Sequence, residues 1–406
     1  MCFVTVPHPL GMISKEEVNA KVDAAFDDIV KAATAWTPSK EKQDAQVKPY
    51  PAKRFKFSGT YADVNDMFQK RKWSLSLPIV PPTVDKVAAM LKGTKRNPAE
   101  VLWVVPPRQG MLTVELVAAL GVMAGAKPEH MPLLIATVEA MADPVAAWRG
   151  PTTTTAATVP VFFISGPIID KLKLNPGTGT AGGENPVTNA LGYFVNLVGD
   201  VVGGSVPPNF DKSTHGSSAD LVAMVFTENA KENPWKTTYA EEAGFKPGDS
   251  IVTHFSAYLG NANIDHDSKT GQRLLTTLST GLLGSASGLA SCLADYDASY
   301  AINNKVSFAF IVLCPEHAAT IAKDFPDQRA ARDFMRETAA MPYKFYSQET
   351  CVPGKDFGPY DENTFIPRFK KTESIKFFVS GGPGKQSQIW VPFPQVFKPV
   401  SKKIAE

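Results

Sequence analysis

The sequence predicts an irregular, layered α/β fold that begins with a separate strand–helix arm. The first observation is that short apolar runs, rich in β-branched and aromatic residues, alternate along the chain with segments of helical periodicity. Strands that alternate with helices in this way are typical of α/β layers. The second observation is that the chain opens on an apolar, β-branched run that prolines end. The third is its 33 prolines and proline-rich C-terminal tail, which indicate irregular packing.

The arm consists of a predicted strand, Cys2–Val6, and a predicted helix that begins at Ser14. Ser14 and Glu17 have the spacing of a capping box, in which each side chain accepts a hydrogen bond from the other residue's backbone N–H. One apolar stripe runs along the helix and comprises Val18, Val22, Phe26, Ile29 and Ala33. A lone strand and helix cannot bury enough apolar surface to be stable by themselves. We therefore expect the arm either to dock on its own chain or to add its strand to the sheet of a partner protein.

The remaining elements are expected to form two α/β regions, because a length of 406 residues suits two or three domains. The predicted parts are the arm, residues 1–36; a polar linker, 37–60; a first α/β region, 61–255; and a second α/β region with the proline-rich tail, 256–406. No clean internal repeat is visible in the sequence.

The first α/β region is predicted to contain both helices and strands. Helices are expected over 61–72, 84–91, 112–126, 129–142 and 187–201, and strands over 101–105, 159–164, 221–226 and 250–255. Val101–Val105 is expected to be a buried strand, because it is a continuous apolar run that Pro106 and Pro107 end.

The second α/β region continues the alternation. Helices are expected over 270–289, from residue 315 onward and over 328–340, and strands over 306–313, 375–379 and 389–391. A glycine-rich turn, Gly381–Lys385, separates the last two strands.

Composition and charge exclude several classes of protein. Apolar residues make up 44% and charged residues 20% of the chain, which is ordinary for a soluble globular protein. The net charge of +2 implies no nucleic-acid partner. No uncharged apolar run reaches the length that spans a membrane, and no signal peptide is visible. We therefore expect neither a membrane protein nor a nucleic-acid-binding protein.

The four cysteines, Cys2, Cys292, Cys314 and Cys351, are widely spaced and form no Cys-x-x-Cys pair. This spacing argues against a structural zinc site or a dithiol within the chain. It favours a reducing, cytoplasmic location.

The main catalytic candidates are Cys314, Glu316 and His317, which follow a predicted strand and open a predicted helix. Ligands of α/β proteins bind at such strand ends. The positive end of a helix favours the thiolate form of a cysteine, and a nearby histidine can act as a general base or orient a substrate. A structural interpretation remains open, in which Glu316 and His317 lie in the first helical turn and Cys314 is a buried apolar residue.

Two glycine-rich loops are candidate sites for an anion. The first, Asn175–Asn185, precedes a predicted helix, and its glycines allow the backbone to approach a ligand closely. The candidate binding residues in this loop are Asn175, Gly177, Thr178 and Gly179. The second loop carries Lys385, which can hold a carboxylate or phosphate. Neither loop is a Rossmann fingerprint or a Walker loop, and either can be a plain surface turn.

Three further polar residues stand at predicted strand ends. Arg108 can pair with a substrate carboxylate or form a structural ion pair. Glu228 and Asn229, close to Trp235 in the sequence, can line a pocket or form a cap or turn.

No cofactor is firmly predicted. His254, Asp265 and His266 lie near predicted strand ends or loops, and their imidazole and carboxylate groups suit a divalent metal. Histidines that are scattered without a recurring short spacing are usually structural. A metal site at these residues is therefore kept only as an alternative.

Several short segments, read in order along the chain, resemble one known family. They are Val6–Leu10 with its following helix, Leu77–Thr83, Val105–Arg108, Ser165–Ile168, Glu228-Asn229 with Asn233–Trp235, Pro315–Ala319 and Val379–Lys385. Together they make nearly the whole chain similar to the UGSC-type (seleno)proteins, a family named for a selenocysteine-Gly-Ser-Cys motif. The resemblance implies a Rossmann-like thiol or selenol domain joined to a larger second module. This chain has no Gly-Ser-Cys motif, so it would hold the second module and the last strand–helix unit of the thiol domain.

The resemblance also implies a function. The chain would be the larger subunit of a heteromeric, thiol-assisted enzyme, a lyase, hydrolase or reductase, that acts on a small anionic organic substrate. Its partner would be a separate chain with a thiol or selenol domain, whose Rossmann-like sheet the arm would complete. Some members have histidine where Ala156 and Gln386 stand here, which weakens direct transfer of catalytic residues. The alternative is a non-catalytic scaffold or regulatory subunit of such a complex, which the missing motif favours.

Overall fold

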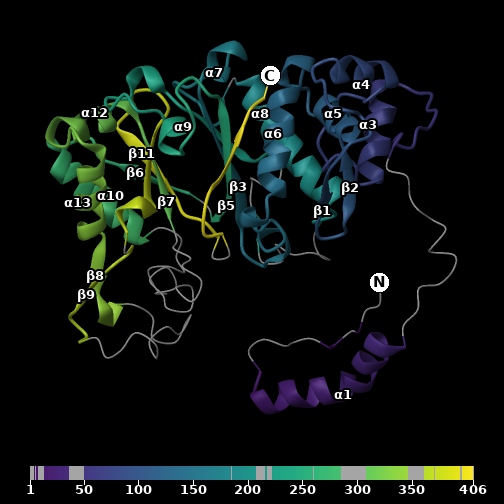
Figure 1. The fold of residues 1–406 in the computed structure, drawn as a ribbon, viewed down its shortest axis with the longest axis horizontal. Helices are drawn as coiled ribbons and strands as arrows, with labels where there is room; N and C mark the ends of the chain where they lie inside the picture. The colour runs from purple at the N-terminus through teal and green to yellow at the C-terminus, as the bar shows by residue number, and fades with distance from the viewer. Residues whose placement is uncertain are drawn as a thin grey trace. The chain divides into compact units, whose positions relative to one another are not determined.

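The computed structural model describes residues 4, 6–7, 13–35, 50–183, 185–206, 215–216, 222–258, 260–284, 308–345, 361–369, 371–393 and 396–405. The chain forms two compact units, residues 1–48 and residues 49–406. Helices and strands are mixed throughout the larger unit (Figure 1), so the predicted α/β class is confirmed. None of the helices in the described ranges combines the length and apolar character needed to cross a membrane.

The smaller unit contains α1 (Lys15–Thr34), the helix that the sequence predicts. The Ser14 hydroxyl accepts a hydrogen bond from the Glu17 N–H at 3.1 Å, and the Ser14 N–H donates to Glu17 Oε2 at 2.9 Å. The predicted capping box is therefore confirmed. Of the predicted strand, Val4 and Val6 are described and belong to neither helix nor strand, while the rest lies outside the described residues.

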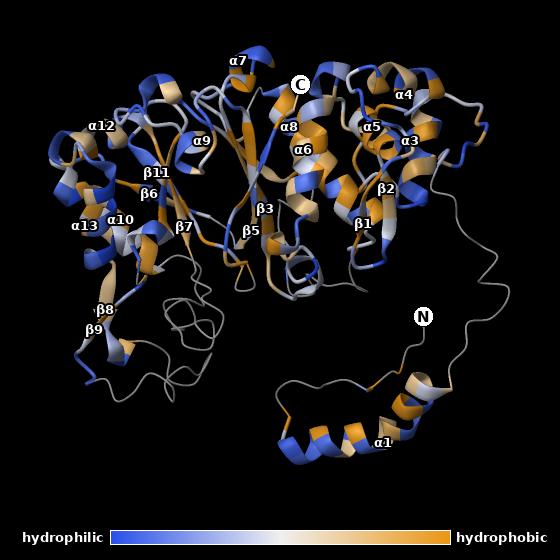
Figure 2. Ribbon diagram, in the orientation of Figure 1, coloured by the Kyte–Doolittle hydropathy of each residue, from blue (hydrophilic) through white to orange (hydrophobic). Residues whose placement is uncertain are grey.

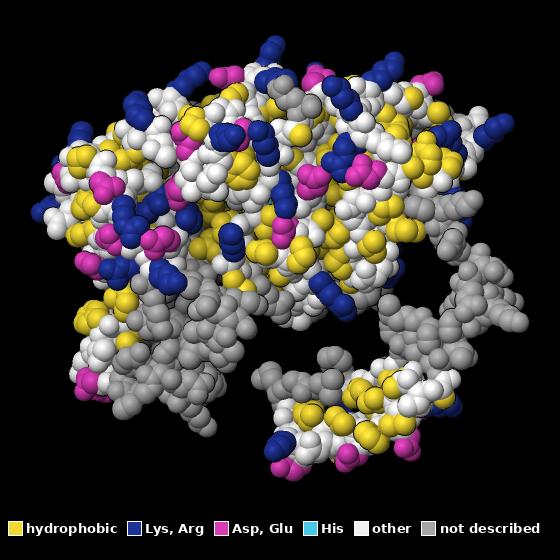
Figure 3. All heavy atoms as spheres, in the orientation of Figure 1, with side chains coloured by type: hydrophobic (Ala, Val, Ile, Leu, Met, Phe, Trp, Pro, Cys, Tyr) yellow, Lys and Arg dark blue, Asp and Glu magenta, His cyan; other side chains and the backbone are white. Residues whose placement is uncertain are grey.

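One side of α1 is apolar and exposed. Val22, Phe26, Ile29 and Val30 are between 40% and 57% exposed, and Figure 3 shows hydrophobic side chains gathered along the visible face of this helix. We call these four residues the α1 apolar face. Exposing apolar side chains to water costs free energy. The α1 apolar face is therefore a surface on which other apolar side chains can pack.

The elements of the larger unit are as follows. Its strands are β1 (Val101–Val105), β2 (Gly110–Thr113), β3 (Thr158–Ser165), β4 (Met224–Thr227), β5 (Ile251–Tyr258), β6 (Asn261–Ile264), β7 (Ala309–Leu313), β8 (Ala340–Pro342), β9 (Phe365–Pro367), β10 (Ile375–Val379), β11 (Gln386–Trp390) and β12 (Val400–Lys403). Its α-helices are α3 (Tyr61–Lys70), α4 (Val84–Leu91), α5 (Val114–Met123), α6 (Met131–Ala142), α7 (Ile168–Lys171), α8 (Pro186–Asn196), α9 (Tyr239–Glu242), α10 (Gly271–Gly284), α12 (Pro315–Asp324) and α13 (Gln328–Thr338). A π-helix, η4 (Leu197–Val202), continues α8.

Two four-stranded sheets form the centre of this unit, with strand orders β12-β5-β3-β4 and β10-β7-β11-β6. We call them the β3 sheet and the β7 sheet. They pack face to face through aromatic side chains, and the ring centroids of Phe163 in β3 and Phe310 in β7 lie 4.3 Å apart. Helices α6 and α8 cover the outer side of the β3 sheet, with α5 packed on these two helices, and α10, α12 and α13 cover the outer side of the β7 sheet (Figure 1). The unit is therefore a four-layer sandwich of helices, sheet, sheet and helices.

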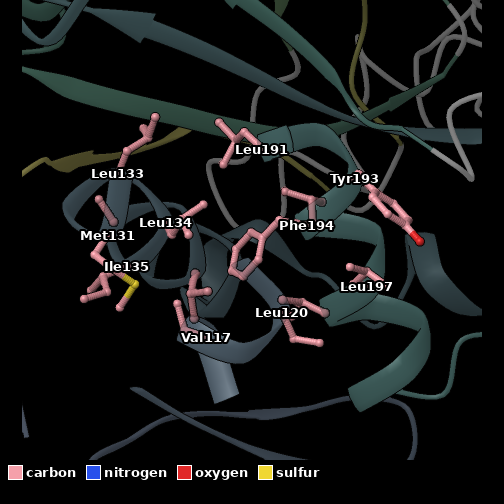
Figure 4. Close-up of a cluster of buried hydrophobic side chains, with 14 of the residues drawn as sticks. Val117, Leu120, Met131, Leu133, Leu134, Ile135, Leu191, Tyr193, Phe194 and Leu197 are labelled. Atoms are coloured by element: carbon pink, nitrogen blue, oxygen red, sulfur yellow. The ribbon is translucent and has the colours of Figure 1, made fainter. Parts of the chain in front are cut away.

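Covering both faces of each sheet explains the continuous apolar runs in the sequence. Every residue of β3 is buried: Phe162 and Ile164 face the helices, while Val161 and Phe163 face the other sheet. Figure 2 shows hydrophobic residues concentrated in the strands and in the helices beside them. Figure 4 shows the helix-side core, with labelled side chains Val117, Leu120, Met131, Leu133, Leu134, Ile135, Leu191, Tyr193, Phe194 and Leu197.

The two sheets repeat one topology. In the β3 sheet, β4 pairs parallel with β3, and β5 pairs antiparallel with β3. In the β7 sheet, β10 and β11 pair with β7 in the same two ways. The parallel pairs even end alike, because the Glu228 N–H donates to Ile164 O at 2.9 Å and the Ser380 N–H donates to Leu313 O at 2.9 Å. The structure thus contains an internal repeat that the sequence does not reveal.

Each half of the repeat contributes its fourth strand to the other sheet. Strand β6 follows β5 in sequence but pairs with β11, and β12 follows β11 but pairs with β5. The two connections cross where the Tyr258 N–H donates to Val391 O at 3.1 Å and the Phe393 N–H donates to Ser256 O at 2.9 Å. We call this arrangement the strand exchange. Since it joins both sheets, the predicted boundary between residues 255 and 256 falls inside β5 of one compact unit.

Most predicted elements are present, with three informative differences. The predicted strand 101–105 is β1, but it is not buried: it forms a two-stranded hairpin with β2, and Val101 and Val104 are 42% and 44% exposed. The helix predicted from residue 112 begins at Val114, because Gly110–Thr113 is β2 and the Thr113 hydroxyl caps the helix by accepting the Leu116 N–H. Strands β2, β6, β8, β9 and β12 were not predicted.

Candidate functional site

The carboxyl ends of β3, β4, β7 and β10 meet at one edge of the sandwich, which we call the carboxyl edge. The Asn229 N–H donates to Val379 O at 2.8 Å, and the Ser380 hydroxyl donates to Thr227 O at 2.7 Å, so the ends of β4 and β10 are directly joined. Strand ends of this kind are where α/β proteins bind ligands. The predicted residues that follow these strands are therefore brought together.

Cys314 and His317 occupy the junction between β7 and α12. Cys314 is the N-cap residue of α12, and Pro315 follows at the first helical position, where its missing N–H costs no hydrogen bond. The side chains are buried, with Cys314 5% and His317 2% exposed. Leu313 ends the strand with a fully buried side chain, which fixes the junction between the sheet and α12.

The His317 ring is held by two hydrogen bonds. Its Nε2 lies 3.1 Å from the backbone oxygen of Asp265, and its Nδ1 lies 2.8 Å from the Ser387 hydroxyl. A carbonyl oxygen can only accept a hydrogen bond, so Nε2 carries the proton. In the neutral ring, Nδ1 is therefore the unprotonated nitrogen, and it accepts a hydrogen bond from the Ser387 hydroxyl.

Cys314 and His317 shift each other's acidity. Burial raises the pKa of the Cys314 thiol, but hydrogen bonds from the His317 side chain and backbone and the His317 charge outweigh it, and the pKa falls below its usual value. Burial lowers the pKa of His317, but its hydrogen bond and charge interaction with Cys314 outweigh that effect and raise the pKa. Both shifts are in the direction that eases proton transfer from the thiol to the imidazole.

Glu316 positions the second glycine-rich loop. Its Oε2 accepts hydrogen bonds from the Gly384 N–H at 2.6 Å and the Lys385 N–H at 3.0 Å, and these bonds lower its pKa. Lys385 has a left-handed backbone, with φ of 50°, and its Nζ donates to His266 O at 2.9 Å. Glu316 and Lys385 thus fix the loop beside His317.

The first glycine-rich loop packs against the second. The Gly381 N–H donates to Pro176 O at 2.8 Å, and a Cβ on Gly382 would lie 2.1 Å from Thr178 Oγ1. A larger residue at position 382 would displace the Thr178 side chain. Within the first loop, the Gly177 N–H donates to Asn175 Oδ1 at 2.9 Å, and Asn175 Nδ2 donates to Thr178 O at 2.7 Å. The bonds of Asn175 thus hold the first loop in shape, and Pro176 and Thr178 are its contacts with the second loop.

Gly179 is the exception in the first loop. Its φ is +77°, and a Cβ at this position would meet nothing within 4 Å. The backbone at Gly179 is therefore open on the side where a side chain would project.

Glu228 and Ser165 form a second buried pair at the carboxyl edge. Ser165 stands at the position in β3 that Cys314 holds after β7, and its hydroxyl forms a short hydrogen bond with Glu228 Oε2. Glu228 Oε1 accepts the Tyr239 N–H at 2.7 Å. Burial raises the pKa of Glu228 to about 7, more than these hydrogen bonds lower it. Asn229 does not face this pair, because its Nδ2 donates to Gly381 O at 3.1 Å and to Glu232.

Arg108 belongs to a different part of the unit. It lies in the turn between β1 and β2, where its N–H donates to Gly203 O at 2.9 Å. Its side chain packs against Gly204, since a Cβ there would lie 2.5 Å from Arg108 Cδ. Arg108 therefore contacts the segment at Gly203 and Gly204, and not the residues that follow β3, β4, β7 and β10 at the carboxyl edge.

The residues of the alternative metal site do not form a ligand cluster. His254 lies fully buried in β5 and stacks on Phe162, and burial lowers its pKa to about 3. The Asp265 carboxylate accepts hydrogen bonds from the hydroxyls of Ser268 at 2.8 Å and Thr277 at 2.6 Å. Within the described ranges, no three His, Cys, Asp or Glu side chains are grouped in a way that could hold a metal ion.

Sequence reasoning missed two residues of this edge. Ser387 contacts the His317 ring, although 70 positions separate the two residues, and Ser165 pairs with Glu228 across 63 positions. For Ser165, the available signal was the likeness of the two junctions, Ser165-Gly-Pro-Ile168 and Cys314-Pro-Glu-His317, which each end a buried strand and open a helix. Ser387 belongs to neither junction.

The chain was also compared with known proteins. No protein-family model matches it, and no curated protein matches it.

Proposed function

We propose that this chain is a subunit of a thiol-assisted enzyme that acts on a small anionic organic substrate. The observation that carries the proposal is that Cys314 and His317 lie together at the start of α12, both buried, where each shifts the pKa of the other. Proton transfer from the thiol to the His317 imidazole would give a thiolate that attacks an electrophilic carbon, and the imidazolium would return the proton to the leaving group. The hydrogen bond from Nε2 to the Asp265 carbonyl supplies the third group, which orients the base.

The surroundings of the pair support an anionic substrate. The N-terminus of α12 has a partial positive charge, because its first backbone N–H groups have no helical partners. Lys385 brings a formal positive charge to the same edge. An attacking thiolate is common to lyase, hydrolase and reductase reactions, and the proposal includes all three.

The thiol chemistry is tested by alkylation. In a variant with Cys2, Cys292 and Cys351 replaced by serine, we expect iodoacetamide to label Cys314 with a pH midpoint below the value of about 8.5 for a free cysteine. His317→Asn should raise this midpoint, and each pKa unit should slow labelling at pH 7 about tenfold. Mass spectrometry of the labelled protein measures both effects.

His266→Asn is the matched control, because this exposed histidine contributes only its backbone oxygen to the edge. It should leave the midpoint unchanged. Labelling that occurs only after unfolding, at every pH, would contradict the catalytic role of Cys314.

A scaffold or regulatory subunit is the second candidate, and the burial of Cys314, at 5% exposure, favours it. A buried cysteine can act as a small apolar residue without any reaction. The same alkylation experiment separates the two functions, because a scaffold requires no reactive thiol.

The α1 apolar face supports the subunit part of the proposal. We propose that it packs against a separate chain with a thiol or selenol domain, and the reading frame immediately upstream is the first candidate for that chain. In co-expression, replacing Phe26 and Ile29 with serine should abolish co-purification, since both side chains would lose their apolar contacts. Replacing the exposed Asp23 and Asp27 with serine is the control and should retain the partner. Equal recovery with both variants would exclude this face.

A further inference from the structure

A cavity of about 540 Å³ opens beside β1 and the segment that follows α6, and neither the carboxyl edge nor the proposed chemistry uses it. The lining residues that set its polarity and charge are Trp103, Met141, Asp143, Trp148, Arg149 and Thr153. Its volume lies within the range of roughly 300–1,000 Å³ that is typical of small-molecule sites. The cavity is built from elements other than those that hold Cys314 and His317.

Two tryptophans form its aromatic wall. Trp103 of β1 and Trp148 meet edge to face, with ring centroids 5.8 Å apart and an interplanar angle of 75°. Trp148 is only 5% exposed, and Gly199 of η4 makes room for it, because a Cβ there would lie 3.2 Å from Trp148 Cζ2. Ala147 has a left-handed backbone, with φ of 48°, a strained conformation of the kind that accumulates at binding sites.

The charge of the cavity is positive. Asp143 is neutralised, because Lys402 Nζ lies 2.7 Å from its Oδ2 and holds its pKa below the usual value. Arg149 is exposed, and among the described residues its guanidinium forms no ion pair or side-chain hydrogen bond. A guanidinium pairs with a carboxylate through two parallel hydrogen bonds. The cavity therefore combines an apolar, aromatic wall with one cation that remains available.

Two buried ring nitrogens, on Trp148 and His254, lie near the cavity without hydrogen-bond partners among the described residues. The indole N–H of Trp148 is buried and has no hydrogen-bond partner in the described part of the chain. The His254 ring lies next to the Trp148 ring, with the ring centroids 5.6 Å apart. His254 Nε2 is also buried and has no hydrogen-bond partner among the described residues. Buried polar groups are nearly always paired, and these two atoms, closed off behind the cavity wall, are exceptions.

From these observations we propose that the cavity walled by Trp103 and Trp148 binds a small carboxylate with an aromatic body, and that Arg149 holds the carboxylate. The flat apolar part of the ligand would lie against the tryptophans, since aromatic rings prefer edge-to-face or offset contacts. This site is independent of the Cys314–His317 proposal.

Binding is tested by calorimetric titration of the full chain with benzoate, and with benzamide as its uncharged counterpart. We expect saturable binding of benzoate by the unaltered protein. Arg149→Gln should weaken benzoate binding about tenfold, because a charge-assisted pair is lost, and should change benzamide binding less than about twofold. Trp103→Leu should weaken both ligands, because the aromatic contact is lost.

Arg273→Gln is the matched control, since Arg273 is an exposed arginine on α10. It should leave benzoate affinity unchanged, and so should Cys314→Ser, which separates this proposal from the proposed function. The proposal is overturned if benzoate does not saturate the protein, if benzamide binds as tightly as benzoate, or if the two arginine variants have the same effect.

Discussion

Replacing Phe163 with alanine is expected to lower the free energy of unfolding of the larger unit by about 4 kcal/mol. The ring of Phe163 is fully buried where the two sheets meet. Its centroid lies 4.3 Å from that of Phe310 and 4.9 Å from that of Phe378, and both belong to the opposite sheet. Truncation therefore removes apolar contacts of both sheets at once and leaves a cavity that the rigid strands cannot close.

Urea denaturation followed by circular dichroism measures this loss. Phe365→Ala is the control, because Phe365 is also in a strand but is 65% exposed. The control should change the free energy of unfolding by less than about 0.5 kcal/mol. Equal effects of the two substitutions would show that Phe163 is not part of a cooperative core between the sheets.

Replacing Glu228 with glutamine is expected to remove a large pH dependence of stability. Burial raises the pKa of Glu228 from 4.5 to about 7, so the folded protein retains a proton that the unfolded chain has released. Between these two values the folded state binds more protons, and the free energy of unfolding must therefore fall as the pH rises. Each pKa unit corresponds to about 1.4 kcal/mol, so the total loss between pH 4.5 and pH 7 is about 3 kcal/mol.

Glutamine has the shape of the protonated carboxylic acid at this site. Its carbonyl can accept the Tyr239 N–H, and its amide can donate to the Ser165 hydroxyl. Glu228→Gln should therefore be as stable as the unaltered protein near pH 5 and about 3 kcal/mol more stable, relative to it, at pH 8. Urea titrations at both pH values measure the difference. Glu362→Gln, at an exposed position, should keep the original pH dependence; a parallel pH dependence in Glu228→Gln would rule out the assignment.

Local signals in the sequence were sufficient for much of the fold. The helix 84–91 and the strand 375–379 have the predicted bounds, because an N-cap threonine begins the helix and buried apolar residues form the strand. The capping box of Ser14 and Glu17 likewise depends only on residues close in sequence. Such signals are reliable where the structure is determined by neighbours along the chain.

Strands β6 and β12 could not be predicted, because both are short edge strands with polar residues. Asn261–Ile264 and Val400–Lys403 show no sustained apolar run, and their partners lie far away in sequence. Pairing over such distances is set by tertiary contacts, which a local pattern does not contain. The internal repeat was hidden for the same reason, since it is a likeness of topology and not of residues.

The candidate site was predictable only in part. Cys314 and His317 were identified because they stand where a buried strand becomes a helix, which is a local feature. The partners that fix the tautomer of His317, the Ser387 hydroxyl and the Asp265 carbonyl, come from other strands and loops. Their contribution follows from the fold, not from any motif.

The strand exchange has a consequence for how this protein tolerates breaks in its backbone. A chain cleaved after Gly284, where α10 ends, would leave two fragments that each lack an outer strand of their own sheet and carry one that completes the other. The fragments should thus reassociate when mixed. The backbone connection between the two halves therefore matters less to this architecture than the edge strand that each half supplies to the sheet of the other.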